Sequence, residues 1–150
     1  VRAEALGVVV RVAEPGDEAA RALVAARLSD PDVEVCRRAM DACETLAEPG
    51  DDCVVDALIG HVVGGEFCIR QMAVRTLQRV AAPGDPAVLS KLLPWSEQGH
   101  WPQRQAALEA LADLAPRGNE AALGAATRRL HDPDETCRQT ACEALGRLAP

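Results

Sequence analysis

The stretch LAEPGD at residues 46–51 decides how this chain folds, because it returns at a fixed interval along the sequence. VAEPGD precedes it at 12–17, VAAPGD follows it at 80–85, and a divergent copy, LAPRGN, stands at 114–119. The first glycine of each copy lies 34 residues after the one before, at Gly16, Gly50, Gly84 and Gly118. A fixed period of this length indicates a tandem-repeat architecture.

Each copy of the stretch predicts the end of one helix and the start of the next. The prolines at 15, 49 and 83 cannot continue a helix, and the following glycine tolerates the left-handed backbone that closes one. The polar residue at the end of the stretch can accept hydrogen bonds from the first free amides of the next helix. These predicted capping residues are Asp17, Asp51, Asp85 and Asn119.

Apolar stripes on both sides of the turn predict two amphipathic helices in each repeat, here called helix A and helix B. Apolar residues recur at steps of three and four before the turn and again after it, for example at Val54, Leu58 and Val62. Two columns of helix A are alanine in all five copies: Ala5, Ala39, Ala73, Ala107 and Ala141, then Ala13, Ala47, Ala81, Ala115 and Ala149. Small residues at these columns predict close helix packing. No stretch alternates with period two, so we expect no strands.

The composition favours a stack of repeats over a deep globular core. The 150 residues include one Phe, two Trp and no Tyr, so alanine, leucine and valine must supply the packing. A helix pair buries little alone, and stacking on its neighbours completes the core. We therefore predict one all-α domain over 1–150, a right-handed α-solenoid of about four and a half repeats, at 1–31, 32–65, 66–99, 100–133 and 134–150. Its ends resemble cuts through a longer array, so we expect further repeats of the same chain.

The repeat resembles the HEAT repeat, in particular the short variety of the phycobilisome lyases. An Asp-Pro-Asp turn leads to an Arg, then an Ala three residues on, then Leu at helical spacing and Gly-Asp, and this likeness covers the whole chain. The resemblance implies an arginine column (Arg2, Arg70, Arg104, Arg138) and an aspartate column (Asp30, Asp132) that form a stacking ladder between repeats. Only Asp132 and Arg138 keep both partners within one copy of the motif. Cys36 stands in the arginine column and Gly64-Gly65 replaces Asp-Pro, so the ladder is expected to be broken there.

The charge and the motifs argue against several classes of function. A net charge of −7 would repel the phosphate backbone, so we expect no nucleic-acid partner. The apolar runs are far below the ~18 residues of a membrane span, so we expect no membrane insertion. His61, His100 and His131 lack metal-ligand spacing, and no phosphate loop, G-x-S-x-G motif or Cys-His constellation is evident. We expect no enzyme, no metal and no cofactor.

The six cysteines favour core packing over disulfides or metal binding. They contain no C-x-x-C pair, and Cys43 and Cys142 fall in apolar columns predicted to be buried. Free core thiols favour a reducing intracellular compartment, such as cytosol, stroma or matrix.

Candidate binding residues gather on helix B and in the third repeat. The helix B column Arg27, His61, Trp95 and Arg129 would line the concave face, as in the family. Pro94 is expected to end its helix early, so that the segment LPWSEQGHWPQRQ at 93–105 forms a loop with Trp95, His100 and Trp101. Tryptophan favours interfaces, but it could also plug the hole that a shortened helix leaves. The column that Trp101 shares with Val33 and Phe67 favours the plug.

The sequence thus predicts a protein–protein interaction scaffold or a structural subunit of a larger assembly. It would bind another protein or a multisubunit complex through the helix B face and the Trp95–Trp101 loop. The alternative is an accessory factor for bilin attachment, similar to the HEAT-type phycobilin lyases, which would need a pocket with an acid for the pyrrole nitrogens. A passive spacer is a third hypothesis.

Overall fold

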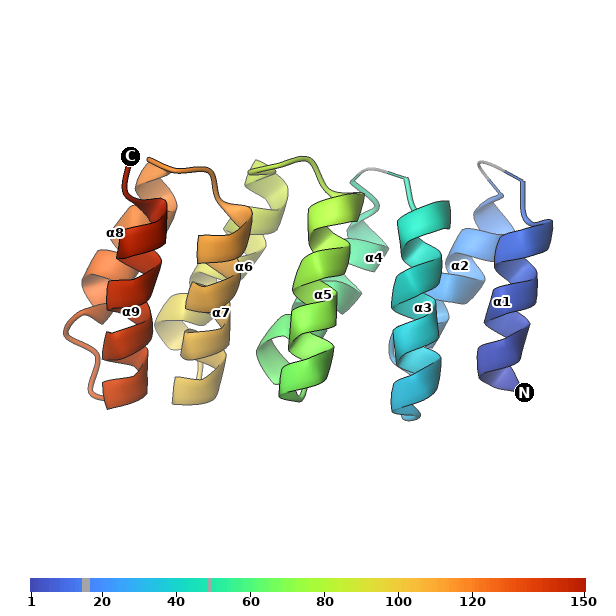
Figure 1. Ribbon diagram of the computed structural model, residues 1–150, viewed down its shortest axis with the longest axis horizontal. Helices are drawn as coiled ribbons and strands as arrows, with labels where there is room; N and C mark the ends of the chain where they lie inside the picture. Colours follow the sequence, from blue (N-terminus) through green and yellow to red (C-terminus); the bar gives the residue numbers. More distant parts are fainter. Residues whose placement is uncertain (15–16, 49) are drawn as a thin grey trace. The chain divides into compact units, whose positions relative to one another are not determined.

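All regular structure in this protein is helical. A computed structural model describes residues 1–14, 17–48 and 50–150, and these residues form nine α-helices and no strand. The helices are α1 (Arg2–Val12), α2 (Glu18–Arg27), α3 (Val33–Leu46), α4 (Asp52–Gly64), α5 (Phe67–Val80), α6 (Pro86–Gln98), α7 (Trp101–Leu114), α8 (Glu120–Arg129) and α9 (Glu135–Leu148) (Figure 1). The all-α fold class and the alternation of helix A (odd numbers) with helix B (even numbers) are confirmed.

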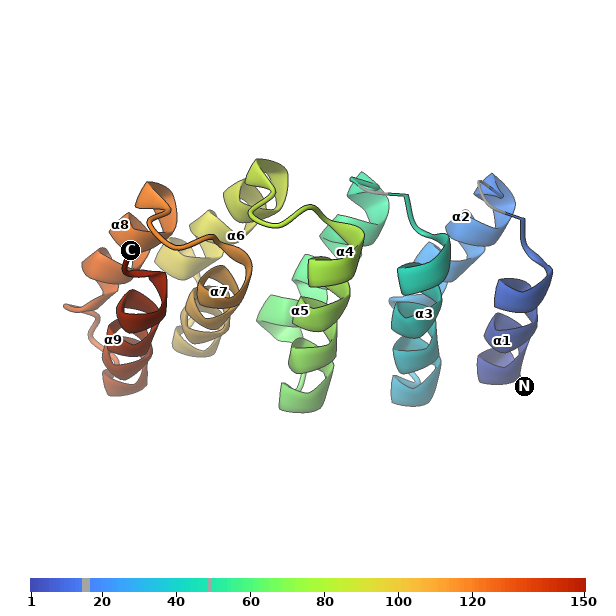
Figure 2. The same cartoon turned by 45° about the horizontal axis from the view of Figure 1, so that its top comes forward.

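The helices are arranged in two compact units. The N-terminal unit holds residues 1–61 and 66–82, and the C-terminal unit holds residues 62–65 and 83–150. In the N-terminal unit α1, α3 and α5 lie side by side, and α2 packs behind α1 and α3 (Figures 1 and 2). In the C-terminal unit α7 lies beside α9 and α6 beside α8, again in two layers. Each unit thus has the layered helix stacking of an α-solenoid, whereas the handedness and the single domain stay predictions.

The polar residues at the turns cap the following helices as predicted. Asp17 Oδ1 accepts a hydrogen bond from the Ala20 amide at 3.0 Å, and Asn119 accepts one from the Ala122 amide at 3.0 Å. Asp51 and Asp85 make equivalent bonds to the first amides of α4 and α6. The predicted roles of Pro15, Gly16 and Pro49 lie outside the described residues.

The repeated glycine has a second role in the C-terminal unit, beyond closing a helix. Gly84 and Gly118 adopt φ of 72° and 78°, and their amides donate to the carbonyl oxygens of Leu114 and Leu148, at 3.2 and 2.8 Å. Each bond joins a turn to the end of the next helix A. A side chain at Gly84 would also place its Cβ 2.7 Å from Pro116 Cδ. The positive φ, which Gly50 shares, explains why glycine recurs at this position, and the close approach adds a second reason at Gly84 alone.

The first alanine column forms the tightest part of the core, and the second column does not belong to it. Ala39, Ala73, Ala107 and Ala141 are each 0% exposed, whereas Ala5 is exposed. The residues of the second column, Ala13 through Ala149, are helix C-caps with extended or nearly extended backbone, and none is fully buried. The prediction that both columns lie at helix contacts was therefore wrong for the second, because the chain leaves the helix at that residue.

The cysteine predictions held for one of the two columns named. Cys43 is 1% exposed, and burial raises the pKa of its thiol to about 12. Cys142 is exposed, although its column partners Leu6, Met40, Val74 and Leu108 are at most 8% exposed. The difference arises because no described helix follows α9 to cover this face. The described residues contain no disulfide and no cluster of three metal-ligating side chains.

Candidate partner-binding surface

The third repeat places both tryptophans on the surface of the C-terminal unit. Trp95 lies in the last turns of α6 and is 38% exposed, and Trp101 is the first residue of α7 and is 48% exposed. Only Gly99 and His100 connect the two helices. The predicted loop was therefore wrong, since 93–105 is mostly helical. We call Trp95, Gly99, His100 and Trp101 the tryptophan corner.

Pro94 does not shorten its helix, contrary to the prediction. Helix α6 runs through Pro94 to Gln98, so it has 13 residues where α2 and α8 have 10. Pro94 is on the exposed side of the helix, while Leu92 and Ser96 on the other side are fully buried. A carbonyl that loses its amide partner to proline can be hydrated on the exposed side. With no shortened helix there is no hole, and Trp101, like Val33 and Phe67 in its column, is exposed and does not act as a plug.

Local hydrogen bonds hold the tryptophan corner in a tight turn. The His100 amide donates to Gln103 Oε1 at 3.0 Å, which satisfies one of the free amides at the start of α7. A Cβ added to Gly99 would lie 2.8 Å from Gln103 Cβ and 3.0 Å from the Trp95 carbonyl oxygen. Only glycine fits such a close approach without displacing its neighbours. Gly99 thus allows the two-residue connection between α6, which carries Trp95, and α7, which begins at Trp101.

A buried ion pair anchors the tryptophan corner to the other end of the repeat. Arg104 NH1 donates to the Gly99 carbonyl oxygen at 2.7 Å, and its Nε and NH2 donate to the two carboxylate oxygens of Asp132 at 2.8 and 2.7 Å. The Asp132 side chain is 0% exposed, and that of Arg104 is 14% exposed. Such a bidentate pair fixes geometry as well as charge. The corner is therefore built on a rigid base.

The charges of this pair stabilise each other. Burial alone would raise the pKa of Asp132, but hydrogen bonds from Arg104 and from the Asp134 amide outweigh burial, so the pKa lies below its ordinary value. The hydrogen bond to Asp132 also raises the pKa of Arg104. Both groups are held in their charged forms.

The arginine ladder has partners other than those expected. Arg2 reaches Asp30 at 3.3 Å, as Arg104 reaches Asp132, so each pair joins the two ends of one repeat instead of two successive repeats. Arg138 does not reach the Asp132 carboxylate in any described contact; its NH1 donates to the carbonyl oxygens of Asp132 and Pro133 at 2.9 and 3.0 Å.

The helix B column is only partly available for binding. Arg129 NH1 lies 3.3 Å from Asp132 Oδ2, and its side chain is 22% exposed, so it belongs in part to the buried pair. In the N-terminal unit Arg27 is exposed, whereas His61 is half-buried. The structure thus brings Trp95, His100 and Trp101 together at one corner and uses Arg129 and His61 partly for internal bonds.

The N-terminal unit contains a cysteine–histidine contact that the sequence did not indicate. Cys36 Sγ donates to the Leu28 carbonyl oxygen at 3.0 Å and lies 3.4 Å from His61 Nε2, which also hydrogen-bonds to that oxygen. Burial, followed by the charge of Asp30, raises the pKa of the Cys36 thiol. A raised pKa disfavours the nucleophilic thiolate. The contact is suited to packing, and the only signal for it in the sequence was the departure at Cys36 from the arginine column.

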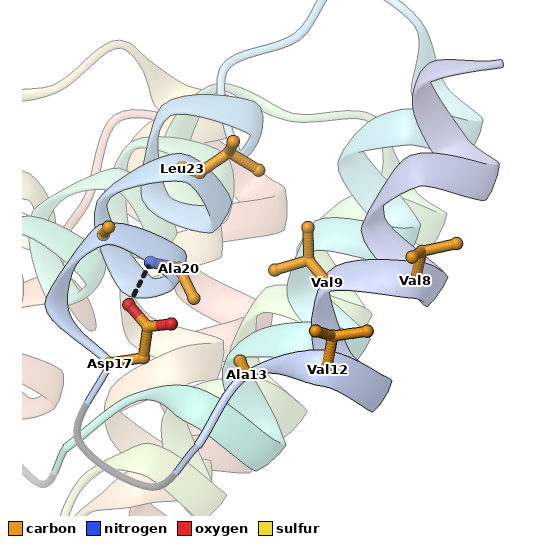
Figure 3. A pocket seen from close by; sticks show the side chains of 8 residues that line it. Val8, Val9, Val12, Ala13, Asp17, Ala20 and Leu23 are labelled. Carbon is orange, nitrogen blue, oxygen red and sulfur yellow. Dashed lines mark hydrogen bonds between the residues drawn. The ribbon is translucent and has the colours of Figure 1, made fainter.

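Each unit has a surface groove between a pair of its helices. The C-terminal unit has a groove of 330 Å³ between α6 and α8, lined by Pro94, Glu97, Gly124 and Arg128 among others. The N-terminal unit has an apolar groove of 360 Å³ between α1 and α2 (Figure 3). Its one acid, Asp17, caps α2 by accepting the Ala20 amide through Oδ1, and no observation on this groove supports the bilin alternative.

Comparisons with known proteins find one family. Residues 123–150, most of α8 and all of α9, match the family model of the HEAT repeat. The crystal structure of an engineered protein from the Northeast Structural Genomics Consortium is similar with a TM-score of 0.44 and 19% identity over 97% of this chain. This chain spans 66% of the length of that engineered protein. No curated protein matches the sequence.

Proposed function

Because this chain is a HEAT-like repeat protein, we propose that it is a protein–protein interaction scaffold or structural subunit of a larger assembly, and that it binds through the tryptophan corner and the helix B surface beside it. HEAT repeats generally mediate protein–protein interactions and are typically non-catalytic. No described helix is long and apolar enough to cross a membrane.

The observation that carries this proposal is the exposure of both tryptophans on a rigid base. Tryptophan is enriched among the residues that contribute most to binding, because it offers a large apolar area at a low entropic cost. Trp95 and Trp101 are 38% and 48% exposed. Moving apolar area of this size out of water is favourable, so a partner that covers the two side chains gains binding energy. The groove between α6 and α8 adjoins this corner, since Pro94 and Glu97 line it.

The charge of the groove indicates what the partner presents there. Glu97 and Glu120 line it together with Arg128, which pairs with Glu97. One carboxylate, that of Glu120, makes no ion pair among the described residues of the groove. We propose that the partner places an apolar side chain on the tryptophans and a basic one beside Glu120.

The proposal is tested by capturing partners on the immobilised chain and identifying them by mass spectrometry. The test variant is Trp95→Ala with Trp101→Ala, and the matched control is Val12→Ala with Val33→Ala, two exposed apolar residues of the N-terminal unit. We expect a recurrent partner that is lost with the test variant and kept with the control. These are the only two tryptophans of the chain, so their fluorescence should also shift when the isolated partner is added. A partner that both variants retain, with no shift, would refute binding at this corner.

A further inference from the structure

The N-terminal unit carries an arginine that lacks the partner its repeat position normally provides. We propose that Arg70 and its neighbour Phe67 form a second binding surface, which takes a partner segment that presents one carboxylate beside a large apolar side chain. Both residues belong to the N-terminal unit, and the proposal does not rest on the tryptophan corner.

Arg70 stands in the arginine column, but no aspartate stands at the position where its ladder partner is expected. Arg2 and Arg104 each pair with an aspartate 28 residues later in the sequence, Asp30 and Asp132. The residue 28 positions after Arg70 is Gln98, which has no carboxylate. Arg70 is therefore the column arginine whose counterpart the sequence has replaced by a neutral residue.

The unmet hydrogen-bonding capacity of Arg70 is visible at the atomic level. Arg21, Arg70 and Arg129 each have a buried Nε without a hydrogen-bond partner among the described residues. Arg21 still pairs with Glu48 at 3.0 Å, and Arg129 pairs with Asp132. No carboxylate among the described residues lies in ion-pair distance of Arg70. A half-buried guanidinium that is neither paired nor fully hydrated gains from an incoming acceptor.

Phe67 completes the surface with apolar area. It is 65% exposed, and the Arg70 guanidinium carbon lies 5.9 Å from the centre of its ring. This distance allows a cation–π interaction, which holds the guanidinium beside the ring. Arginine and aromatic residues are the types most often found at the energetic centres of interfaces.

The occupant is best matched by a single carboxylate in an apolar setting. Arginine binds carboxylates in a bidentate manner, and the exposed ring needs an apolar neighbour to leave water. A polyanion such as nucleic acid would meet a chain with a net charge of −7. An isolated Asp or Glu next to a large aliphatic or aromatic residue avoids most of that repulsion. The proposed occupant is therefore a peptide segment of a partner protein in which an Asp or Glu stands next to a large apolar residue.

The test is a subtractive selection from a random peptide library displayed on phage. The library is first depleted on the Arg70→Gln variant, and the remaining phage are selected on the unmodified chain. We expect enriched peptides with Asp or Glu next to a large apolar residue. Their synthetic forms should bind about tenfold more weakly to Arg70→Gln, and to Phe67→Ala, than to the unmodified chain.

Two controls separate the surface from unspecific charge effects. Glu66 lies four residues before Arg70, and its negative charge would repel the carboxylate of the peptide. The variant Glu66→Gln removes that charge, so the peptide should bind equally well or more tightly. Replacing the peptide Asp by Asn should weaken binding to the unmodified chain and change little for Arg70→Gln, because both changes remove the same contact. If Arg70→Gln does not fold, Phe67→Ala serves for depletion, since that side chain lies mostly outside the core. Failure to enrich any peptide, or enrichment of peptides without a carboxylate, would overturn the proposal.

Discussion

Arg104 and Cys36 occupy the same column of the repeat but anchor their helices in different ways. In the C-terminal unit Arg104 donates to the Gly99 carbonyl oxygen of the preceding turn and also reaches the Asp132 carboxylate. In the N-terminal unit Cys36 donates to the Leu28 carbonyl oxygen, at the end of the preceding helix, and makes no ion pair. Arg138, again in this column, donates to two carbonyl oxygens of its preceding turn.

The comparison separates two functions that one arginine can combine. The function common to Cys36, Arg104 and Arg138 is to donate to backbone carbonyls just before helix A. The ion pair is additional and needs an aspartate 28 residues later. A thiol can therefore replace the guanidinium at one repeat without loss of the local turn, but with loss of the link to the far end of the repeat.

The largest expected effect is the loss of the buried pair at Arg104. Asp132→Ala would leave Arg104, with a side chain only 14% exposed, without its carboxylate. Removing one partner of a buried pair costs several kcal/mol because the other charge stays buried, and we expect a loss of about 3 kcal/mol in the free energy of unfolding. Urea unfolding followed by circular dichroism measures it. The matched control is Asp30→Ala, whose carboxylate is also buried, at 3% exposure, but whose partner Arg2 is 56% exposed. The charge left behind on Arg2 stays hydrated, so this variant should cost about 1 kcal/mol or less. Equal losses for the two variants would contradict the distinction between a buried and an exposed ladder arginine.

Lowering the pH should weaken the pair of Arg104 and Asp132, with a smaller loss of stability than Asp132→Ala causes. The pKa of Asp132 is lower in the folded chain than its ordinary value, so its contribution to stability is present above that ordinary value, about 3.9, and is lost as the pH falls through the folded pKa. We expect the melting temperature of the unmodified chain to fall more steeply below about pH 4 than that of Asp132→Asn. If the melting temperatures of the two proteins fall in parallel between pH 6 and pH 2.5, folding does not lower the pKa of Asp132.

How much of this could be anticipated from the sequence depends on the range of the interaction. The helix caps at Asp17 and Asn119 and the buried column at Ala73 follow from local chemistry and helical spacing, and they were predicted correctly. The hydrogen bond from Gly118 to Leu148 and the contact of Cys36 with His61 join residues 30 and 25 positions apart, so spacing within one helix gave no sign of them.

The candidate site was predicted in part, for a related reason. Both tryptophans were identified, but the proline rule suggested a loop at Pro94 where a helix continues. The rule describes the cost of a missing hydrogen bond, and that cost is smaller where the freed carbonyl can bind water, as on the exposed side of α6 that carries Pro94. Tertiary exposure, which a single sequence does not contain, decided the outcome. The availability of Arg129 was misjudged in the same way, because its contact with Asp132 forms only after folding.

The smallest expected effect concerns the thiol that replaces the arginine. Cys36→Ala removes one buried donor to the Leu28 carbonyl and leaves a small cavity, and we expect a loss of about 1 kcal/mol in the free energy of unfolding. The loss stays small because His61 Nε2 hydrogen-bonds to the same carbonyl oxygen and keeps it satisfied. The double variant Cys36→Ala with His61→Ala should therefore lose more than the sum of the single variants, since the carbonyl would then have neither donor. Urea unfolding of the four proteins gives this coupling, and strictly additive losses would show that the two side chains act independently on the turn.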